Sequence, residues 1–592
     1  MSKKTIISII ICFVLITALV FVQNYRAVKD SAVENETAVA QPKPEEPKAV
    51  SYKALAGDAK STEFKFETNL FNITFDTEGA SISSLTLKQH ADADGTYSDI
   101  IFREDGDNNA FLLYWGDDYT KPVKDVFDCR TEGNKVIFTK SYEKPDGNEF
   151  TVVKTYEFRD NDYLFAVTVD ITGDELTEGD YAYTLAYEPQ VGPSFAKLKN
   201  NSYDYRHFYA GLVKNGKVKR STVKLSNNQF VSTKDFDWFS LTSKYFTVIA
   251  RPMDNTVAYK YRAIEGQGDI SQTDGMYISV PSSETEPTTI YFYCGPQLKQ
   301  YLKSYYNGND NQWGLRDYNL DDAMESSGAL GWLENGLKWC LNMLYKLIPN
   351  YGIGIIILTL IIKLVLWPLQ KKSTESTAKM SALSPQLKEI QAKYPDNPQK
   401  QNEETQRLYQ EMGVNPLGGC LPLLIQFPIL IAFYGLLNKH FELRGAMFIP
   451  GWIPDLSIPE TVCRLGFNIP LLGSEIHLLP FIYTASMIFS MKYTQASTPQ
   501  QGDQKNTTMW FMTYGMPIMF FFILYAAPSG LLLYWTVQNA LSIMQQVYTN
   551  KQVSSGAFDK KNQTVKKEPK AVLDYQEKLR KLEEKKNGKK GK

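Results

Sequence analysis

Residues 352–369 read GIGIIILTLIIKLVLWPL, and this run decides the fold. Apolar side chains fill it almost without interruption; its polar exceptions are Thr359 and Lys363. An α-helix rises about 1.5 Å per residue, so a run of this length reaches across most of the hydrocarbon core of a bilayer. The run therefore predicts a transmembrane helix, although the mean hydropathy of the whole chain is only -0.30.

Further apolar runs of similar length predict a polytopic α-helical membrane protein with six transmembrane helices. Lys3 and Lys4 precede the first run, residues 5–22, which we interpret as an uncleaved anchor rather than a cleaved signal peptide because no A-x-A-like site follows it. Pro528-Ser-Gly530 predicts a tight turn between the last two spans. The remaining predicted spans are residues 417–437, 476–493, 509–527 and 531–548.

Composition divides the chain into segments with different physical character. The C-terminal tail holds 14 Lys or Arg against 6 Asp or Glu, which favours a cytoplasmic location. Six spans then place both termini on the cytoplasmic side of a bacterial inner membrane. The domain after the anchor is therefore exported. We predict an anchor at 1–26, a flexible periplasmic linker at 27–60, a periplasmic β-domain at 61–318, an interfacial amphipathic helix at 319–350, a five-helix core at 351–550 with a cytoplasmic hairpin at 370–416, and a basic tail at 551–592.

Alternating apolar and polar residues dominate the exported segment. Phe71-Asn-Ile73-Thr-Phe75 and the run from Thr151 to Phe158 show this period of two, and Pro145-Asp-Gly-Asn148 is typical of a turn between strands. The pattern predicts a large antiparallel β-sandwich. Its many aromatic residues indicate a core more readily than a carbohydrate site. Cys129 and Cys294 fall in this domain, and the sequence leaves open a disulfide or two free thiols.

Two segments beside the spans have helical character. Leucines recur at three and four from Leu330 to Leu347, with Trp332 and Trp339 among them, which favours a helix at the membrane surface over one packed on the β-domain. In the 370–416 loop, residues 374–393 and 399–412 predict two helices separated by the prolines of YPDNP.

The sequence carries no signature of an enzyme, a metal site or a cofactor site. It has no GxSxG, GxxxxGK[ST] or HExxH motif, and its six cysteines and four histidines show no ligand spacing. We therefore expect a protein that is not an enzyme and needs neither a cofactor nor a metal.

Lys363 is the central charge in the five later spans, and a charge at this depth costs at least about 2.5 kcal/mol. It could snorkel to the interface, but helical side chains lean toward the N-terminus, away from the cytoplasmic surface, so a hydrated cavity is favoured. Uncharged polar residues lie at similar depth in the spans, and together with the lysine they suggest a wet groove: Thr359, Gln426, Thr484, Tyr534, Trp535, Gln538 and Asn539.

Two longer motifs connect these features to a known family. Residues 408–428 read LYQEMGVNPLGGCLPLLIQFP, and residues 528–539 read PSGLLLYWTVQN, followed by Gln545-Gln546. Both closely resemble signatures of the YidC membrane-protein insertase family, and the layout of the entire chain resembles its Gram-negative members. The resemblance implies an insertase and chaperone that inserts and folds inner-membrane proteins, alone or with the Sec translocon.

The resemblance also implies details of the fold and the site. It implies a supersandwich β-domain with a fold like that of sugar enzymes, and a hydrophilic groove in which Lys363 stands where the family has an arginine. Lysine keeps the positive charge but loses bidentate hydrogen bonding. The groove residues are expected to be Lys363, Thr359, Gln426, Tyr534, Trp535 and Asn539.

Nascent membrane proteins, the Sec translocon and membrane lipids are the expected partners. The basic tail and the cytoplasmic loops could contact ribosomal RNA, or the tail could only set topology and attract anionic lipid. Two other classes of function stay open: a secondary transporter, and a periplasmic chaperone whose activity lies in the β-domain.

Overall fold

A computed structural model describes the chain between residues 51 and 554. The anchor at 1–26, most of the linker and all but the start of the tail lie outside the described residues. Within the range, the description omits residues 56–59, 92–96, 103–108, 117–118, 177–178, 193–206, 215–216, 224–229, 234–235, 244, 254–257, 266–271, 285, 325–329, 396, 413–420, 471 and 496–509.

The chain divides into two compact units. Of the described residues, those up to Asn342 and Ile431–Ile458 form the β unit, and Met343–Leu430 with those from Pro459 onward form the helical unit. The boundary falls inside two continuous helices, α3 (Gly331–Leu347) and α7 (Leu421–Lys439).

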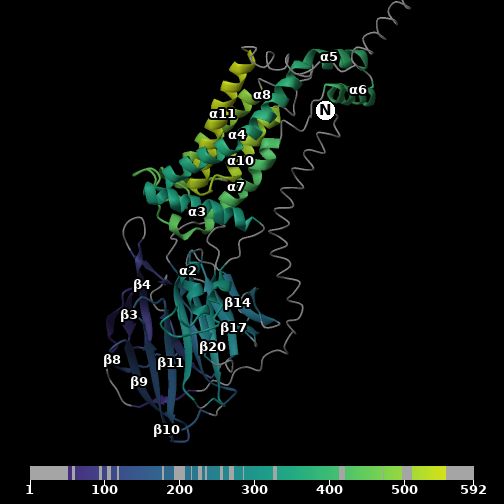
Figure 1. Cartoon of the computed structure of the whole chain (residues 1–592). Helices are drawn as coiled ribbons and strands as arrows, with labels where there is room; N and C mark the ends of the chain where they lie inside the picture. Colours follow the sequence, from purple (N-terminus) through teal and green to yellow (C-terminus); the bar gives the residue numbers. More distant parts are fainter. Residues whose placement is uncertain are drawn as a thin grey trace, which may run out of the picture. The chain divides into compact units, whose positions relative to one another are not determined.

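Antiparallel sheets build most of the β unit (Figure 1). The largest has ten strands, in the order β1 (Lys53–Ala54), β9 (Lys135–Glu143), β10 (Glu149–Glu157), β11 (Leu164–Gly173), β21 (Thr288–Pro296), β18 (Phe246–Pro252), β17 (Phe236–Thr242), β14 (His207–Lys214) and β15 (Lys217–Val223), with β8 (Asp128–Glu132) paired to β9. A second has the order β16 (Phe230–Thr233), β19 (Ala258–Glu265), β20 (Gln272–Pro281), β12 (Tyr181–Tyr187) and β7 (Leu112–Trp115). Smaller sheets consist of β2 (Glu63–Glu67), β3 (Phe71–Asp76), β4 (Ser81–Ala91) and β5 (Tyr97–Asp99), and of β6 (Ile101–Phe102) with β13 (Gln190–Val191).

One apolar core joins these sheets. Side chains from the ten-stranded, five-stranded and four-stranded sheets all contribute to it, among them Phe75, Tyr156 and Ile278. Strand β3 shows the predicted alternation, with Phe71, Ile73 and Phe75 buried and their neighbours half-buried. The sheets therefore pack face to face, as the period of two predicts. Cys129 and Cys294 are both free thiols, so the alternative of a disulfide is wrong.

After β21 the chain continues through short helical turns, α2 (Lys299–Leu302), η2 (Lys303–Tyr306) and η3 (Leu320–Ala323), to α3. The helical unit then contains α4 (Tyr351–Ala382), α5 (Ser384–Lys393), α6 (Pro398–Glu411), the β22–β23 hairpin (Cys463–Ile469 and Gly473–Ile476), α8 (Leu479–Gln495), the π-helical turn η6 (Phe511–Gly515), α10 (Met516–Ile523) and α11 (Ser529–Ser554). The 3-10 turn η5 (Phe441–Leu443) follows α7. Helix α11 packs against α4 and α8, and α10 packs against α8 (Figure 1).

Among the described residues, one helix is long and apolar enough to span a bilayer, Tyr351–Lys371, with a mean hydropathy of 2.3. Shorter apolar helices occur at Gln426–Leu437 and Thr513–Ile523. The run at 352–369 therefore forms the predicted helix, and the other predicted spans remain predictions.

One helix boundary and one hairpin differ from the sequence expectation. Helix α4 continues through Pro368 to Ala382, so the loop expected from residue 370 begins as helix. The β22–β23 hairpin was not predicted. The predicted break between α5 and α6 is present, and Asn397 caps α6 by accepting a hydrogen bond from Lys400 N at 3.1 Å.

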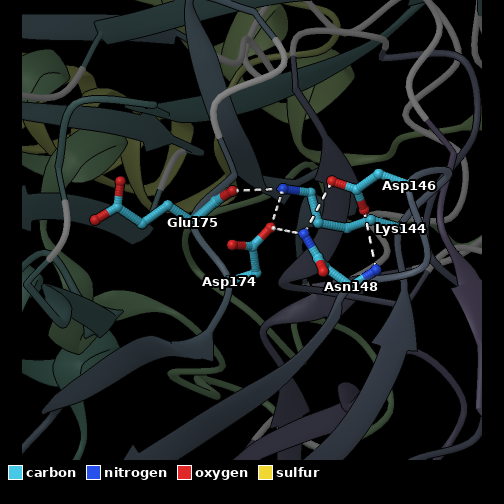
Figure 2. A network of polar contacts seen from close by, with 5 residues as sticks. All are labelled: Lys144, Asp146, Asn148, Asp174 and Glu175. Atoms are coloured by element: carbon cyan, nitrogen blue, oxygen red, sulfur yellow. Dashed lines mark hydrogen bonds and ion pairs between the residues drawn. The ribbon is translucent and has the colours of Figure 1, made fainter.

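The predicted turn at Pro145 lies in the hairpin between β9 and β10 and is held by a polar network (Figure 2). Lys144 Nζ donates to Asp174 Oδ2 at 2.6 Å and to the Glu175 carbonyl at 2.8 Å. Asn148 Nδ2 donates to the same carboxylate oxygen of Asp174 at 3.3 Å. The hydrogen bond from Lys144 lowers the pKa of Asp174. The network thus ties the hairpin to the end of β11.

We expect Asp174→Asn to remove an acid-sensitive part of the hairpin's protection from hydrogen exchange. A depressed carboxyl pKa contributes stability that is present above the ordinary pKa and is lost as the pH falls through the folded-state value. Hydrogen exchange in the wild-type hairpin should therefore become faster on acidification below about pH 4. In Asp174→Asn the hairpin should already exchange faster at neutral pH, and its protection should depend less on pH. Glu175→Gln is the control, since the Glu175 side chain points away from Lys144 in Figure 2. Equal acid profiles for wild type and Asp174→Asn would contradict the assignment.

Candidate functional site: a buried lysine between two helices

Helix α4 has a buried face that carries polar groups and an exposed face that is apolar. Ile355, Thr359 and Lys363, spaced by four residues, are buried with exposures of 0%, 0% and 5%. The opposite face exposes Leu364 and Val365 at 59% and 71%. In a soluble protein the exposed face would be polar, so this inverted pattern suits a helix that meets lipid on one side and other helices on the other.

Lys363 reaches α11. Its Nζ donates a hydrogen bond to Ser542 Oγ at 2.8 Å, and Ser542 Oγ donates to the Gln538 carbonyl at 2.8 Å. Within the described part of the chain, Lys363 forms no ion pair with a carboxylate. A buried lysine normally has a carboxylate partner or a ligand, so the position of Lys363 calls for a physical explanation.

Thr359 lies one turn before Lys363 but uses its hydroxyl within its own helix. Thr359 Oγ1 donates to the Ile355 carbonyl at 2.6 Å. This bond satisfies the hydroxyl without a neighbouring helix. Thr359 therefore adds a buried polar position beside Lys363 rather than a link to α11.

Helix α11 carries three of the predicted residues, and two of them face α8. The Trp535 ring stacks on Tyr483 with centroids 5.1 Å apart, and Asn539 Nδ2 donates to Ser486 Oγ at 3.0 Å. Tyr534 is buried at 1% exposure. Gln538, one turn before Ser542, is 3% exposed, and its Oε1 has no hydrogen-bond partner among the described residues.

Gln426 is half-buried on α7, and the hydrogen bonds of the Lys363 and Thr359 side chains go to other residues. The structure thus brings Lys363 and Thr359 together on α4 and joins Lys363 to α11, but it does not link Gln426 to them. The first motif, residues 408–428, is described only in part, because 413–420 lie outside the described residues.

The sequence analysis missed Ser542 and Ser486. Ser542 follows Gln538 by four residues, so the helical period that selected Gln538 could also have selected Ser542. Among the described residues no group of His, Cys, Asp or Glu side chains could hold a metal ion.

Helix α3 also exposes apolar side chains on one face. Trp332, Trp339 and Leu347 are 73%, 66% and 74% exposed, whereas Leu337 and Leu341 on the other face are buried. Exposed tryptophans on one helical face are typical of a helix at a membrane interface.

Comparisons with known proteins identify the family. Residues 343–556 match the family model described as 60Kd inner membrane protein, and residues 63–335 match the model of the YidC periplasmic domain. The membrane protein insertase YidC of Treponema denticola is 38% identical over 513 residues, covering 83% of this chain and 87% of that protein. Its namesake from Treponema pallidum is 34% identical, covering 81% of this chain and 83% of that protein.

Among solved structures, an active YidC insertase crystal structure with its first transmembrane domain resolved covers 84% of this chain and 94% of its own, at 19% identity and a TM-score of 0.36. The two family models together span the β unit and the helices that carry Lys363 and Ser542. With relatives this similar along most of both lengths, the chain belongs to the YidC family of membrane protein insertases.

Proposed function

We propose that this chain inserts nascent membrane proteins into the inner membrane through a polar groove centred on Lys363. The groove would accept the hydrophilic end of a substrate and lower the cost of moving it partway across the bilayer. Lys363, Thr359, Gln426, Tyr534, Trp535 and Asn539 are the proposed groove residues. The observation that carries the proposal is the burial of Lys363 without a carboxylate partner in the described chain.

Charge explains which substrates the groove would favour. Lys363 offers one ammonium, and its hydrogen bond to Ser542 at 2.8 Å orients the side chain toward α11. An acidic residue of a segment to be exported could form the missing ion pair with this ammonium. The family resemblance implies an arginine at this position, and lysine acts instead as a point charge, so recognition would depend on charge more than on a fixed bidentate geometry.

Apolar surface supports the release of substrate into lipid. Leu364 and Val365 are exposed on the face of α4 opposite Lys363, and Met544 on α11 is 67% exposed. A hydrophobic substrate helix can exchange contacts with such surfaces for contacts with lipid at little cost. Hydrophobic partitioning and the membrane potential would then drive insertion without a nucleotide.

Topology and partners complete the proposal. We infer six transmembrane helices, cytoplasmic termini and a supersandwich β-domain in the periplasm, with α3 at the outer interface. The Sec translocon would share some substrates, the basic tail would contact the ribosome or anionic lipid, and the chain itself would not be an enzyme.

Insertion by purified protein in proteoliposomes is expected to continue after ATP has been removed. The substrate should be a short membrane protein with an acidic exported tail, synthesised first and freed of nucleotide by a hydrolase. Protease protection of the tail measures insertion, and liposomes without the protein are the control. Strict dependence on ATP would contradict the mechanism, and saturable uptake of a small solute in place of insertion would favour a transporter.

A further inference from the structure

The segment that follows α7 supplies an aromatic side chain to the core of the β unit. Phe441, 8% exposed, belongs to the same core cluster as the strand residues. Its ring lies edge-on to Tyr245 and Phe246, with centroids 6.1 and 5.5 Å away. Arg444 places its guanidinium 5.0 Å from the centre of the Phe246 ring. The turn between β17 and β18 is thus covered by residues encoded about two hundred positions later.

The segment is itself folded, which makes it a defined docking element. Leu443, Ile453 and Leu456 are fully buried. The Asp455 carboxylate accepts hydrogen bonds from Gly445 N at 3.0 Å and Ser457 N at 2.7 Å. These bonds close the segment into a compact loop, so it presents Phe441 and Arg444 with little remaining freedom.

A charge cluster connects the same segment to α3. Lys338 Nζ lies 3.5 Å from Glu442 Oε1, and His440, with a side chain 1% exposed, contacts the other carboxylate oxygen. Burial alone would raise the pKa of Glu442, but the hydrogen bond and charge of His440 and the charge of Lys338 outweigh it and lower the pKa to about 2. Glu442 is therefore ionised at every physiological pH.

Close packing continues along the end of α7. A Cβ atom at Gly435 would lie 3.2 Å from the Glu334 carboxylate of α3, so a side chain there would crowd that contact. Residues 431–458 group with the β unit, whereas the first half of the same α7 helix groups with the helical unit.

We propose that residues 440–458 form a clamp that completes the β-domain core and fastens it to α3 and to the end of α7. Since Phe441 follows β21 by well over a hundred residues, the core at the β17–β18 turn closes only after α7 and its following loop have been made and brought to the β-domain. The clamp is a conformational device: it makes the finished β-domain dependent on the placement of α7. This inference does not rest on the groove.

Hydrogen exchange in the purified full-length protein tests the apolar half of the clamp. Phe441→Ala is expected to accelerate exchange in residues 239–250, at the β17–β18 turn, by about tenfold, because a buried aromatic and its ring contacts are lost. Strands β9 and β10 should be unchanged. Phe467→Ala is the matched control, since Phe467 is 65% exposed. Unchanged exchange at 239–250 in Phe441→Ala would overturn the proposal.

A double-mutant cycle tests the charged half. Lys338→Met and Glu442→Gln should each accelerate exchange in residues 441–458, and the double variant should exchange no faster than Glu442→Gln alone, since the two side chains act on each other. If the accelerations of exchange in the two single variants multiplied in the double variant, the Lys338–Glu442 pair would not couple α3 to the loop. Lys346→Met, on the same helix, is the control and should leave the loop unchanged.

Discussion

Lys363→Ala is expected to lower insertion of a membrane protein with an acidic exported tail by about tenfold or more, whereas Lys363→Arg should retain most of it. A hydrogen bond to a charged group contributes about 1.5 to 3 kcal/mol, and a loss of 1.4 kcal/mol is tenfold. Alanine removes both the ammonium and its bond to Ser542, while arginine keeps the charge. Complementation of an insertase-depleted cell, scored by protease protection of the tail, measures the effect.

Lys371→Ala provides the matched control. Lys371 is a lysine on the same helix but is exposed, so its loss removes a positive charge without opening the buried site. Both alanine variants should reach wild-type levels in the membrane before their activities are compared. A second substrate with a neutral exported tail should separate charge recognition from general insertion, because Lys363→Ala should impair it less.

Each outcome assigns a different role to the lysine. Equal rescue by wild type, Lys363→Ala and Lys363→Arg would preserve the insertase and reduce Lys363 to a residue that snorkels toward the interface. Failure of a well-expressed wild type to rescue would favour a transporter or a host-specific partner.

Local patterns in the sequence predicted the elements whose own residues determine them. The period of two at Phe71–Phe75 gave strand β3, and the apolar run at 352–369 gave the spanning part of α4. The helix continues past Leu369 because Ser, Thr, Glu, Ala and Lys are compatible with helix, and a polar composition alone does not end one. The β22–β23 hairpin was missed because β22 is mostly exposed, β23 is half-buried throughout, and neither shows a clean alternation.

The site could be predicted only in part. A lysine within an apolar run can be recognised from the sequence as a candidate site residue, because placing its charge in the bilayer costs free energy. Its partner Ser542 is 179 positions away, and no local pattern links the two. The same holds for the clamp, in which Phe441 meets Phe246 through tertiary packing alone. Contacts between distant segments depend on the whole fold, and a single sequence does not reveal them.

Lys154 occupies a core position of β10 that the alternating pattern would assign to an apolar residue. Its side chain is fully buried, and Nζ donates to the carbonyls of Ala80, at 2.8 Å, and Phe111. Ala80 and Phe111 have positive φ angles of 50° and 64°, which residues with a Cβ rarely adopt. The lysine thus satisfies two carbonyls at two strained turns and helps to hold both turns in place.

At about pH 10, where the free side chain is close to its own pKa, Lys154→Met is expected to destabilise the β-domain by about 1 to 3 kcal/mol, because methionine fills a similar volume but leaves the Phe111 carbonyl buried without this donor. Tyr156 continues to donate to Ala80 at 2.8 Å, so the second carbonyl keeps a partner. Denaturant unfolding of the full-length protein measures the loss, with hydrogen exchange in β9 and β10 as the readout for this domain. Lys65→Met is the control, since Lys65 is exposed on β2.

The pH dependence of this loss reports the charge of the buried amine. Burial lowers the pKa of Lys154 well below its ordinary value. Between the folded-state pKa and about 10.4, the unfolded chain binds a proton that the folded chain lacks, so stability rises with pH and falls on acidification by about 1.4 kcal/mol per unit. The Met variant lacks this slope, and the advantage of the wild type over it should shrink as the pH is lowered from about 10. A constant difference across that range would mean that the two carbonyls hold Lys154 as an ammonium ion inside the core.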